Sequence, residues 1–197
     1  MISALILAAG ESLRMGSKNK LLLQIGSELL ITKFVKSVSE SNTSEVIVVL
    51  GHEGKKIRSA LKGQLLKFID NPHYYEGMTS SIQFGVKSSS KESLGLMICL
   101  ADMPFAETLD FNILIQAFLK FRRTEISPIV IPVFEGKRGN PVIFSKEFRD
   151  EILAHKGEGC KEIVKQHANF VKEVHMKNDN LLRDIDTPED YNYYTKQ

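Results

Sequence analysis

Short apolar runs alternate with amphipathic stretches along this chain. Near-continuous runs of valine, isoleucine and leucine are typical of strands that are covered on both faces, because neither face meets water. Such runs predict strands over residues 2–8, 45–50, 65–70, 94–100, 129–134, 141–144 and 170–176. The glycine-bearing segment 135–139 predicts a hairpin between two of these strands.

Apolar residues at helical spacing fill the intervals between the predicted strands. Leu30, Phe34, Val35 and Val38 share one helical face, and Ser27 is the predicted N-cap of that helix, before Glu28. Further helices are predicted over 53–61, 78–86, 109–121 and 160–167, and from residue 187 onward. The alternation predicts an α/β sandwich, and the hairpin makes its sheet mixed.

Size and composition predict one globular domain over residues 1–197. The 26 basic and 24 acidic residues give a net charge of +2, which is too balanced to indicate a nucleic-acid-binding or membrane-binding surface. Cys99 and Cys160 are the only cysteines, and in a chain of this size they favour reduced thiols. The N-terminal apolar run meets Glu11 and Arg14 too early for a signal peptide or a membrane span. A cytoplasmic location is therefore expected.

The segment after the first predicted strand has the features of a phosphate-binding loop. Ala8, Ala9 and Gly10 leave main-chain N–H groups accessible to a polyphosphate, and Arg14 and Lys20 supply positive charge. The segment contains neither a Walker sequence nor a Gly-x-Gly-x-x-Gly sequence, which argues against a P-loop NTPase and a dinucleotide oxidoreductase. The pattern indicates nucleotide chemistry of another kind.

Acidic residues follow the apolar runs at two places. Asp102 directly follows the run 94–101, where a carboxylate faces the ligand crevice of an α/β sheet and suits Mg²⁺; capping of the turn before Pro104 is the alternative. Asp184 and Asp186 lie two residues apart in a segment that is expected to be extended, so they point the same way and one of them could reach the metal. The same segment equally fits a helix start capped by Thr187.

Two loops are candidate ligand contacts. Residues 71–81 combine turn formers, aromatic residues and hydroxyl groups, which suit recognition of a base or ribose but also suit a plain connection. Residues 137–140 place two cations beside a glycine, which suits an anionic second substrate or a solvated hairpin tip. The five histidines show no metal-ligand spacing.

Taken together, five motifs resemble those of the MobA-like nucleotidyltransferases. They are Leu7-Ala8-Ala9-Gly10-x-Ser12-x-Arg14-Met15-Gly16 with Lys20, Asn71-Pro72 with Gly77-Met78-x-x-Ser81, Asp102-Met103-Pro104, Gly139-Asn140-Pro141-Val142 and Asp184-Ile185-Asp186-Thr187-Pro188. The resemblance implies a Rossmann-like three-layer α/β/α fold of the nucleotide-diphospho-sugar transferase type, with a mixed, mostly parallel sheet. It also implies Mg²⁺-dependent transfer of NMP from an NTP to a phosphate monoester, with release of pyrophosphate.

The resemblance assigns roles to residues of this chain. Catalytic roles fall to Arg14, Lys20 and Asp102, and metal binding to Asp102 and Asp186. Nucleotide binding falls to Leu7, Ala8, Ala9, Gly10, Ser12, Arg14, Lys20, Asn71, Gly77, Met78 and Ser81. Acceptor binding falls to Arg138, Gly139, Asn140 and Asp184.

The later motifs resemble the molybdenum cofactor cytidylyltransferase branch. That branch implies CTP as donor, the terminal phosphate of molybdopterin as acceptor and a molybdoenzyme as recipient of the product. Gly159-Cys160-Lys161-Glu162 matches the family only loosely. GTP, a sugar or alcohol phosphate acceptor, and a non-catalytic cofactor-delivery protein therefore stay open as alternatives.

Overall fold

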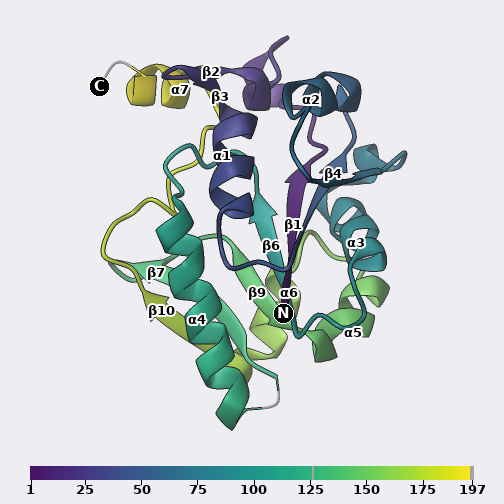
Figure 1. Ribbon diagram of the computed structural model, residues 1–197, viewed down its shortest axis with the longest axis vertical. Coiled ribbons are helices and arrows are strands. Elements are labelled where there is room, and N and C mark those ends of the chain that lie inside the picture. The colour runs from purple at the N-terminus through teal and green to yellow at the C-terminus, as the bar shows by residue number, and fades with distance from the viewer. Residues whose placement is uncertain (126, 196–197) are drawn as a thin grey trace.

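A mixed eight-stranded sheet forms the centre of the computed structural model, which describes residues 1–125 and 127–195 (Figure 1). Seven strands follow one another in the order β10-β7-β9-β6-β1-β4-β5, and β8 pairs with β7. The strands are β1 (Ile2–Ala8), β4 (Glu45–Leu50), β5 (Lys67–Asp70), β6 (Gly95–Leu100), β7 (Ile129–Phe134), β8 (Lys137–Arg138), β9 (Val142–Ser145) and β10 (Val171–His175). The predicted strands and the predicted hairpin are all present, with ends that differ by a residue or two.

The sheet is mostly parallel, as the resemblance implies. β1 pairs in parallel with β4 and β6, β4 with β5, and β7 with β10. β9 runs antiparallel to both of its neighbours, β6 and β7. The carboxyl ends of β1, β4, β5 and β6 consequently meet at one edge, where ligands of open α/β sheets bind.

Helices cover both faces of the sheet and complete the three-layer α/β/α architecture. One layer contains α1 (Leu30–Ser39), α2 (Gly54–Ala60) and α4 (Thr108–Thr124), and the other contains α3 (Met78–Ser88), α5 (Arg149–Ala154) and α6 (Lys161–Gln166). Alternate residues of β1 serve the two layers: Ile6 packs toward α1 and α4, whereas Leu5 packs toward α3. This period of two follows from strand geometry.

The expected N-cap at Ser27 is wrong. Ser27 lies in the turn of a small antiparallel hairpin formed by β2 (Gln24–Ile25) and β3 (Glu28–Leu29), and α1 begins only at Leu30. Gly26 has a φ of +65°, a conformation that glycine adopts without steric cost. A Gly-Ser pair between two short extended segments is itself a hairpin pattern, which prevails here over the capping preference of serine.

The segment after β10 returns to the carboxyl edge of the sheet. Its main chain is attached beside β6, where the Ile185 N–H donates to the carbonyl of Asp102 at 2.9 Å. It then forms α7 (Pro188–Thr195), which lies beside the β2–β3 hairpin (Figure 1). The Tyr191 hydroxyl donates to the Gln24 carbonyl at 3.0 Å and ties α7 to that hairpin.

Two further expectations concern the whole chain. Cys99 and Cys160, which the sequence favours as reduced thiols, are both free in the structure. Across the described residues, no helix combines the length and the apolar character that crossing a membrane requires.

Candidate active site

A cavity of about 350 Å³ opens at the carboxyl edge of the sheet, beside the end of β1. Its wall combines the loop after β1, the end of β6, the start of α3 and one residue from the connection between α5 and α6. The lining residues are Leu7, Ala9, Gly10, Glu11, Ser12, Leu13, Lys20, Leu21, Tyr74, Tyr75, Gly77, Met78, Ser81, Leu100, Ala101, Asp102 and Glu158. The volume lies in the range of small-molecule sites.

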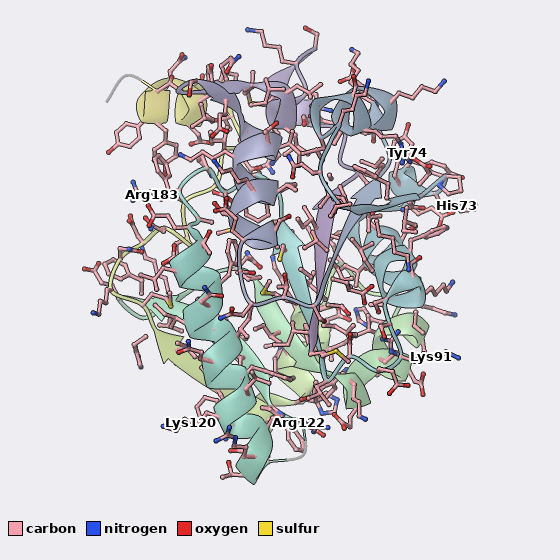
Figure 2. The ribbon with its side chains drawn as sticks, in the orientation of Figure 1. His73, Tyr74, Lys91, Lys120, Arg122 and Arg183 are labelled. Carbon is pink, nitrogen blue, oxygen red and sulfur yellow. The ribbon has the colours of Figure 1, made fainter. Side chains whose placement is uncertain are left out.

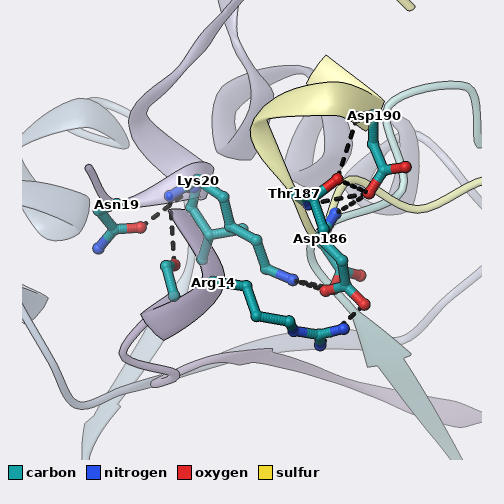
Figure 3. A network of polar contacts seen from close by, with 9 residues as sticks. Arg14, Asn19, Lys20, Asp186, Thr187 and Asp190 are labelled. Atoms are coloured by element: carbon teal, nitrogen blue, oxygen red, sulfur yellow. Dashed lines mark hydrogen bonds and ion pairs between the residues drawn. The ribbon is translucent and has the colours of Figure 1, made fainter. Parts of the chain in front are cut away.

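The loop after β1 is fixed by hydrogen bonds within itself. The Ser12 hydroxyl accepts from the main-chain N–H of Lys20 at 3.2 Å, and the Asn19 side chain accepts from the N–H of Leu21 at 3.1 Å (Figure 3). The backbone of Ser12 has a φ of +53°. These contacts close the loop and set the start of the short 3-10 helix η2 (Lys20–Leu22), so that the Lys20 side chain points toward the end of β6.

Lys20 bridges two carboxylates that are far apart in the sequence. Its Nζ lies 2.6 Å from Asp102 Oδ2 and 2.6 Å from Asp186 Oδ1. Arg14 approaches Asp186 from the other side, with its Nη2 2.9 Å from Oδ2 (Figure 3). The side chains of Lys20 and Asp102 are largely buried, whereas Arg14 is 68% exposed. The predicted catalytic residues Arg14, Lys20 and Asp102 thus gather around Asp186.

The charges of this cluster shift two pKa values. Burial acts to lower the pKa of Lys20, but the negative charge of Asp102 and the hydrogen bonds to Asp102 and Asp186 outweigh it and raise that pKa. Burial raises the pKa of Asp184, and the neighbouring charges of Asp102 and Asp186 raise it further. The site is therefore a concentrated negative charge that Lys20 partly neutralises.

The residues present fit a divalent cation. Asp102, Asp184 and Asp186 each offer a carboxylate oxygen, and these oxygens lie within 4.8 Å of one another. Asp102 Oδ1 is buried and has no hydrogen-bond partner among the described residues. Because a buried polar atom without a partner is costly and carboxylate oxygens are ligands that Mg²⁺ prefers, the donor set suits such an ion.

The two interpretations of the segment 184–187 both hold. Asp184 and Asp186 reach the carboxylate cluster while Ile185 is fully buried, as the alternation predicts. Thr187 also starts α7: its hydroxyl accepts from the Asp190 N–H at 3.2 Å, and Asp190 Oδ2 accepts from the N–H groups of Thr187 and Asp186 at 2.8 and 3.1 Å. The helix start therefore fixes the main chain of Asp186.

Those hydrogen bonds also shift the pKa of Asp190. Burial acts to raise it, but the bonds from the Thr187 hydroxyl and from the N–H groups of Thr187 and Asp186 outweigh burial and lower that pKa. Asp190 is thereby kept ionised as the acceptor that the main chain of Asp186 needs.

The segment after β5 contributes aromatic side chains rather than Asn71. Tyr74 and Tyr75 line the cavity from the 3-10 helix η3 (Tyr74–Glu76), and Figure 2 shows Tyr74 beside the end of α3 that faces α2. Asn71 is buried instead of lining the cavity. Its Nδ2 donates to the Ser80 and Ser81 hydroxyls at 3.1 Å, and its Oδ1 accepts from the His73 N–H at 2.9 Å. Asn71 therefore shapes the loop that carries the lining residues.

Most other residues predicted to contact the nucleotide line the cavity, and two do not. Leu7, Ala9, Gly10, Ser12, Lys20, Gly77, Met78 and Ser81 all contribute to its wall. Ala8 is fully buried in the core, since alternate residues of β1 face opposite layers. Arg14 lies outside the wall, paired with Asp186.

Three of the four residues predicted to bind the acceptor, Arg138, Gly139 and Asn140, make contacts outside the cavity instead. Arg138 is paired with Glu173 on β10, with Nε 2.8 Å from Oε1, and does not line the cavity. Gly139 packs against the C-terminal segment so closely that a Cβ atom would lie 2.2 Å from the Leu181 carbonyl oxygen. The Asn140 N–H donates to that same oxygen at 3.0 Å. Gly139 and Asn140 thus support the segment that leads to Asp184, which itself joins the carboxylate cluster.

Several lining residues were absent from the predicted site. Glu11 and Leu13 sit inside the loop motif at its variable positions. Glu158 comes from a connection without regular structure, and the only local indication is that a glycine stands on either side of it. Such a pattern predicts a turn but not where the turn packs.

Comparisons with known proteins agree with this geometry. The family model described as the MobA-like NTP transferase domain matches residues 4–170. Among curated proteins, the bifunctional protein GlmU of Francisella tularensis subsp. novicida is 38% identical over 69 residues. That match covers 34% of this chain and only 15% of GlmU.

Solved structures share the fold over the whole chain. Rv0371c of Mycobacterium tuberculosis H37Rv has a TM-score of 0.85 at 19% identity, covering 100% of this chain and 98% of that one. A structure of Rv0371c in complex with manganese has a TM-score of 0.80 at the same identity, and covers 100% of this chain and 98% of that one. The nucleotidyl transferase Mth528 from Methanothermobacter has a TM-score of 0.84 at 19% identity, covering 100% and 96%. At these identities the likeness shows a common fold.

Proposed function

The chain belongs to the MobA-like NTP transferase family, and from that premise we propose that residues 1–197 form one catalytic domain that transfers CMP from CTP to the terminal phosphate of molybdopterin. In this reaction an oxygen of the acceptor phosphate forms a bond to the α-phosphorus of CTP. The bond from the α-phosphorus to the oxygen bridging it to the β-phosphorus breaks, and pyrophosphate leaves. The observation that carries the proposal is the cluster of Lys20, Asp102, Asp184 and Asp186 at the edge of the cavity.

The residues of the site have separate tasks in this reaction. The acceptor phosphate is already a nucleophile, so alignment and charge neutralisation suffice and no activated serine or cysteine is required. The loop after β1 surrounds the nucleotide, and Lys20 and Arg14 bind its phosphates. Their positive charge opposes the negative charge that develops on pyrophosphate as it leaves.

The carboxylates are assigned to the metal. Asp102 and Asp186 would hold Mg²⁺, with Asp184 assisting them, and a solved structure of Rv0371c contains manganese. When bound, the ion supplies positive charge to the phosphate oxygens. Lys20 contacts one oxygen of Asp102 and one of Asp186, so it would share these carboxylates with a bound cation, and the phosphates would offer it a further partner.

The assignment is tested by measuring pyrophosphate release. The purified protein is incubated with Mg²⁺, each of the four NTPs in turn, and molybdopterin cofactor, a sugar phosphate or an alcohol phosphate. Release with CTP and molybdopterin alone supports the proposal. Release with GTP, or with another acceptor, replaces that substrate assignment, and tight cofactor binding without any release indicates a delivery protein instead.

Asp102→Asn provides the matched test of the site. The substitution keeps the size of the side chain but removes a negative charge, and we expect turnover to fall by about 10²- to 10³-fold because an electrostatic contact is lost. Asp70→Asn is the control, since Asp70 ends β5 at the same edge and pairs with the exposed Arg58 instead of with the carboxylate cluster. Equal activity of the two variants would remove Asp102 from the mechanism. Circular dichroism checks that both fold.

A further inference from the structure

Among the described residues that line the cavity, Glu158 alone comes from outside three segments: β1 with the loop after it, the segment from η3 to the start of α3, and the end of β6. It lies in the connection between α5 and α6, in the turn 157–159, which has no regular secondary structure. Gly159 has a φ of +65°, and a Cβ atom there would lie 3.3 Å from Met78 Sδ. The turn is therefore packed tightly against the first residue of α3, and the cavity is bounded on this side by Met78 and Glu158 together.

A single hydroxyl group fastens this turn to α3. The Thr79 hydroxyl donates to the Gly157 carbonyl and accepts from the Gly159 N–H at 2.9 Å. The carbonyl before Glu158 and the N–H group after it are thus both hydrogen-bonded to the same side chain. Thr79 itself is not among the residues that line the cavity.

Gln83 fastens the start of the same connection, one helical turn further along α3. Its Nε2 lies 2.8 Å from the His155 carbonyl oxygen and 3.1 and 3.2 Å from those of Leu153 and Ile152. The last carbonyls of a helix have no partner within it, and here the amide of Gln83 supplies one for α5. Residues four apart on a helix share a face, so Gln83 holds the end of α5 and Thr79 holds the turn 157–159 that follows it.

We propose that Thr79 and Gln83 are positioning residues that hold the turn 157–159 as a wall of the cavity and so set the place of Glu158 for substrate binding. An ionised carboxylate only accepts hydrogen bonds, so Glu158 selects a substrate group that donates one, such as an amino group of the base or of the acceptor. The carboxylate cluster lies on other elements and does not depend on Thr79. Loss of the Thr79 hydroxyl should therefore weaken binding and spare the chemical step.

The kinetic test rests on the proposed function and uses Thr79→Val, which keeps the side-chain shape and removes the hydroxyl. We expect KM for one or both substrates to rise roughly tenfold while kcat changes by less than about threefold, the size expected for one or two lost hydrogen bonds. Thr79→Ser restores the wild-type KM. The source of the donating group follows from whether KM rises for the nucleotide, for the acceptor or for both. A fall in kcat with an unchanged KM would overturn the proposal.

A double-mutant cycle separates positioning from a purely structural effect. If Thr79 acts through Glu158, the variant that combines Thr79→Val with Glu158→Ala has the same KM as Glu158→Ala alone. Additive effects of the two substitutions would show that Thr79 does not work through Glu158. Gln83→Met is a second variant that removes hydrogen bonds to the connection between α5 and α6. Gln166→Met, at an exposed position, is its control.

Alkylation of Cys160 gives a readout that does not need turnover. Cys160 directly follows the turn, and burial raises its pKa to about 12, so iodoacetamide reacts with it slowly in the wild-type protein. We expect Thr79→Val to accelerate this reaction severalfold, whereas the fully buried Cys99 stays unreactive. If the rate of Cys160 alkylation is unchanged in both Thr79→Val and Gln83→Met, the proposal that these residues hold the turn 157–159 is contradicted. Absence of pyrophosphate release from the wild type would contradict the proposed function alone.

Discussion

The ammonium group of Lys20 occupies the space between the two carboxylates that are assigned to the metal, 2.6 Å from an oxygen of each. Its charge therefore competes with a cation when no nucleotide is bound. At separations of about 4 Å, two unit charges near a protein surface interact by about 4 kcal/mol. Removing this one positive charge should change the affinity of the cluster for cations more than any other single substitution on the loop.

We expect Lys20→Met to bind Mn²⁺ at least about tenfold more tightly than the wild type in the absence of nucleotide, because the carboxylates lose their internal counter-charge. The same variant should lose turnover, because the phosphates lose a cationic partner. Isothermal titration with Mn²⁺ measures the first effect, with the exposed Lys18→Met as control. Weaker Mn²⁺ binding by Lys20→Met would mean that Lys20 supports the metal site instead of competing for it.

Much of the site could be predicted residue by residue, because the place where a strand ends and the side to which each side chain points follow from the local sequence. Asp102 follows an apolar run, and Asp184 and Asp186 share a side, so their approach needs only the sheet order. The contacts of Asn71 and Arg138 could not be predicted, because partners far away in the sequence decide whether a turn residue is buried or exposed. Asn71 turns inward to Ser80 and Ser81, and Arg138 turns to Glu173.

Among the elements, α7 has the most direct effect on the site because its first turn holds Asp186. Asp190 accepts hydrogen bonds from the N–H groups of both Asp186 and Thr187, and Tyr191 ties the helix to the β2–β3 hairpin. The orientation of Asp186, one of the carboxylates proposed to hold the metal, thus depends on how well one short helix begins. Under that proposal, residues that do not line the cavity should change the affinity for the metal.

Asp190→Ala should lower the free energy of unfolding by about 1 kcal/mol, the usual size of a helix-capping interaction, because Asp190 exchanges hydrogen bonds with the N-cap residue Thr187. It should also weaken Mn²⁺ binding, because the main chain of Asp186 loses a hydrogen bond. Thermal unfolding and a Mn²⁺ titration measure the two effects. Glu189→Ala, an exposed acid in the same first turn, is the control, and identical behaviour of the two variants would refute the role given to Asp190.

The elements themselves were predictable where hydrophobic periodicity extends over a whole strand or helix. The β2–β3 hairpin escaped prediction because each of its strands has only two residues, too few for a period to appear. Its Gly-Ser turn was the available indication, and the capping preference of serine concealed it. The position of the turn 157–159 escaped prediction for another reason, because the turn is hydrogen-bonded to Thr79 on a helix far away in the sequence.

On the scale of the whole molecule, the cavity joins segments that lie far apart in the sequence. The loop after β1, the start of α3, the end of β6 and Glu158 all contribute to one wall. A ligand that contacts them together binds the folded chain and not the unfolded one. Its binding energy therefore adds to the stability of the entire domain.

We expect CTP with Mg²⁺ at about 100 times the dissociation constant to stabilise the protein by about 2.7 kcal/mol. For a chain of this length, that corresponds to a rise in Tm of about 5 to 10 °C. Differential scanning calorimetry with each NTP, with and without Mg²⁺, measures the rise. The Mg²⁺-dependent part should disappear in Asp102→Asn, and an unchanged Tm with every nucleotide would contradict nucleotide binding in this cavity.

The attachment of Ile185 to the carbonyl of Asp102 has a consequence for biosynthesis. A nascent chain that has left the ribosome only as far as β10 carries the glycine loop, Lys20 and Asp102 but lacks both later carboxylates. Since a domain folds as a unit, the carboxylate cluster is complete only when the segment after β10 is in place. Under the proposed function, a chain that ends at β10 lacks two of the three carboxylates assigned to the metal, and we expect it to be inactive.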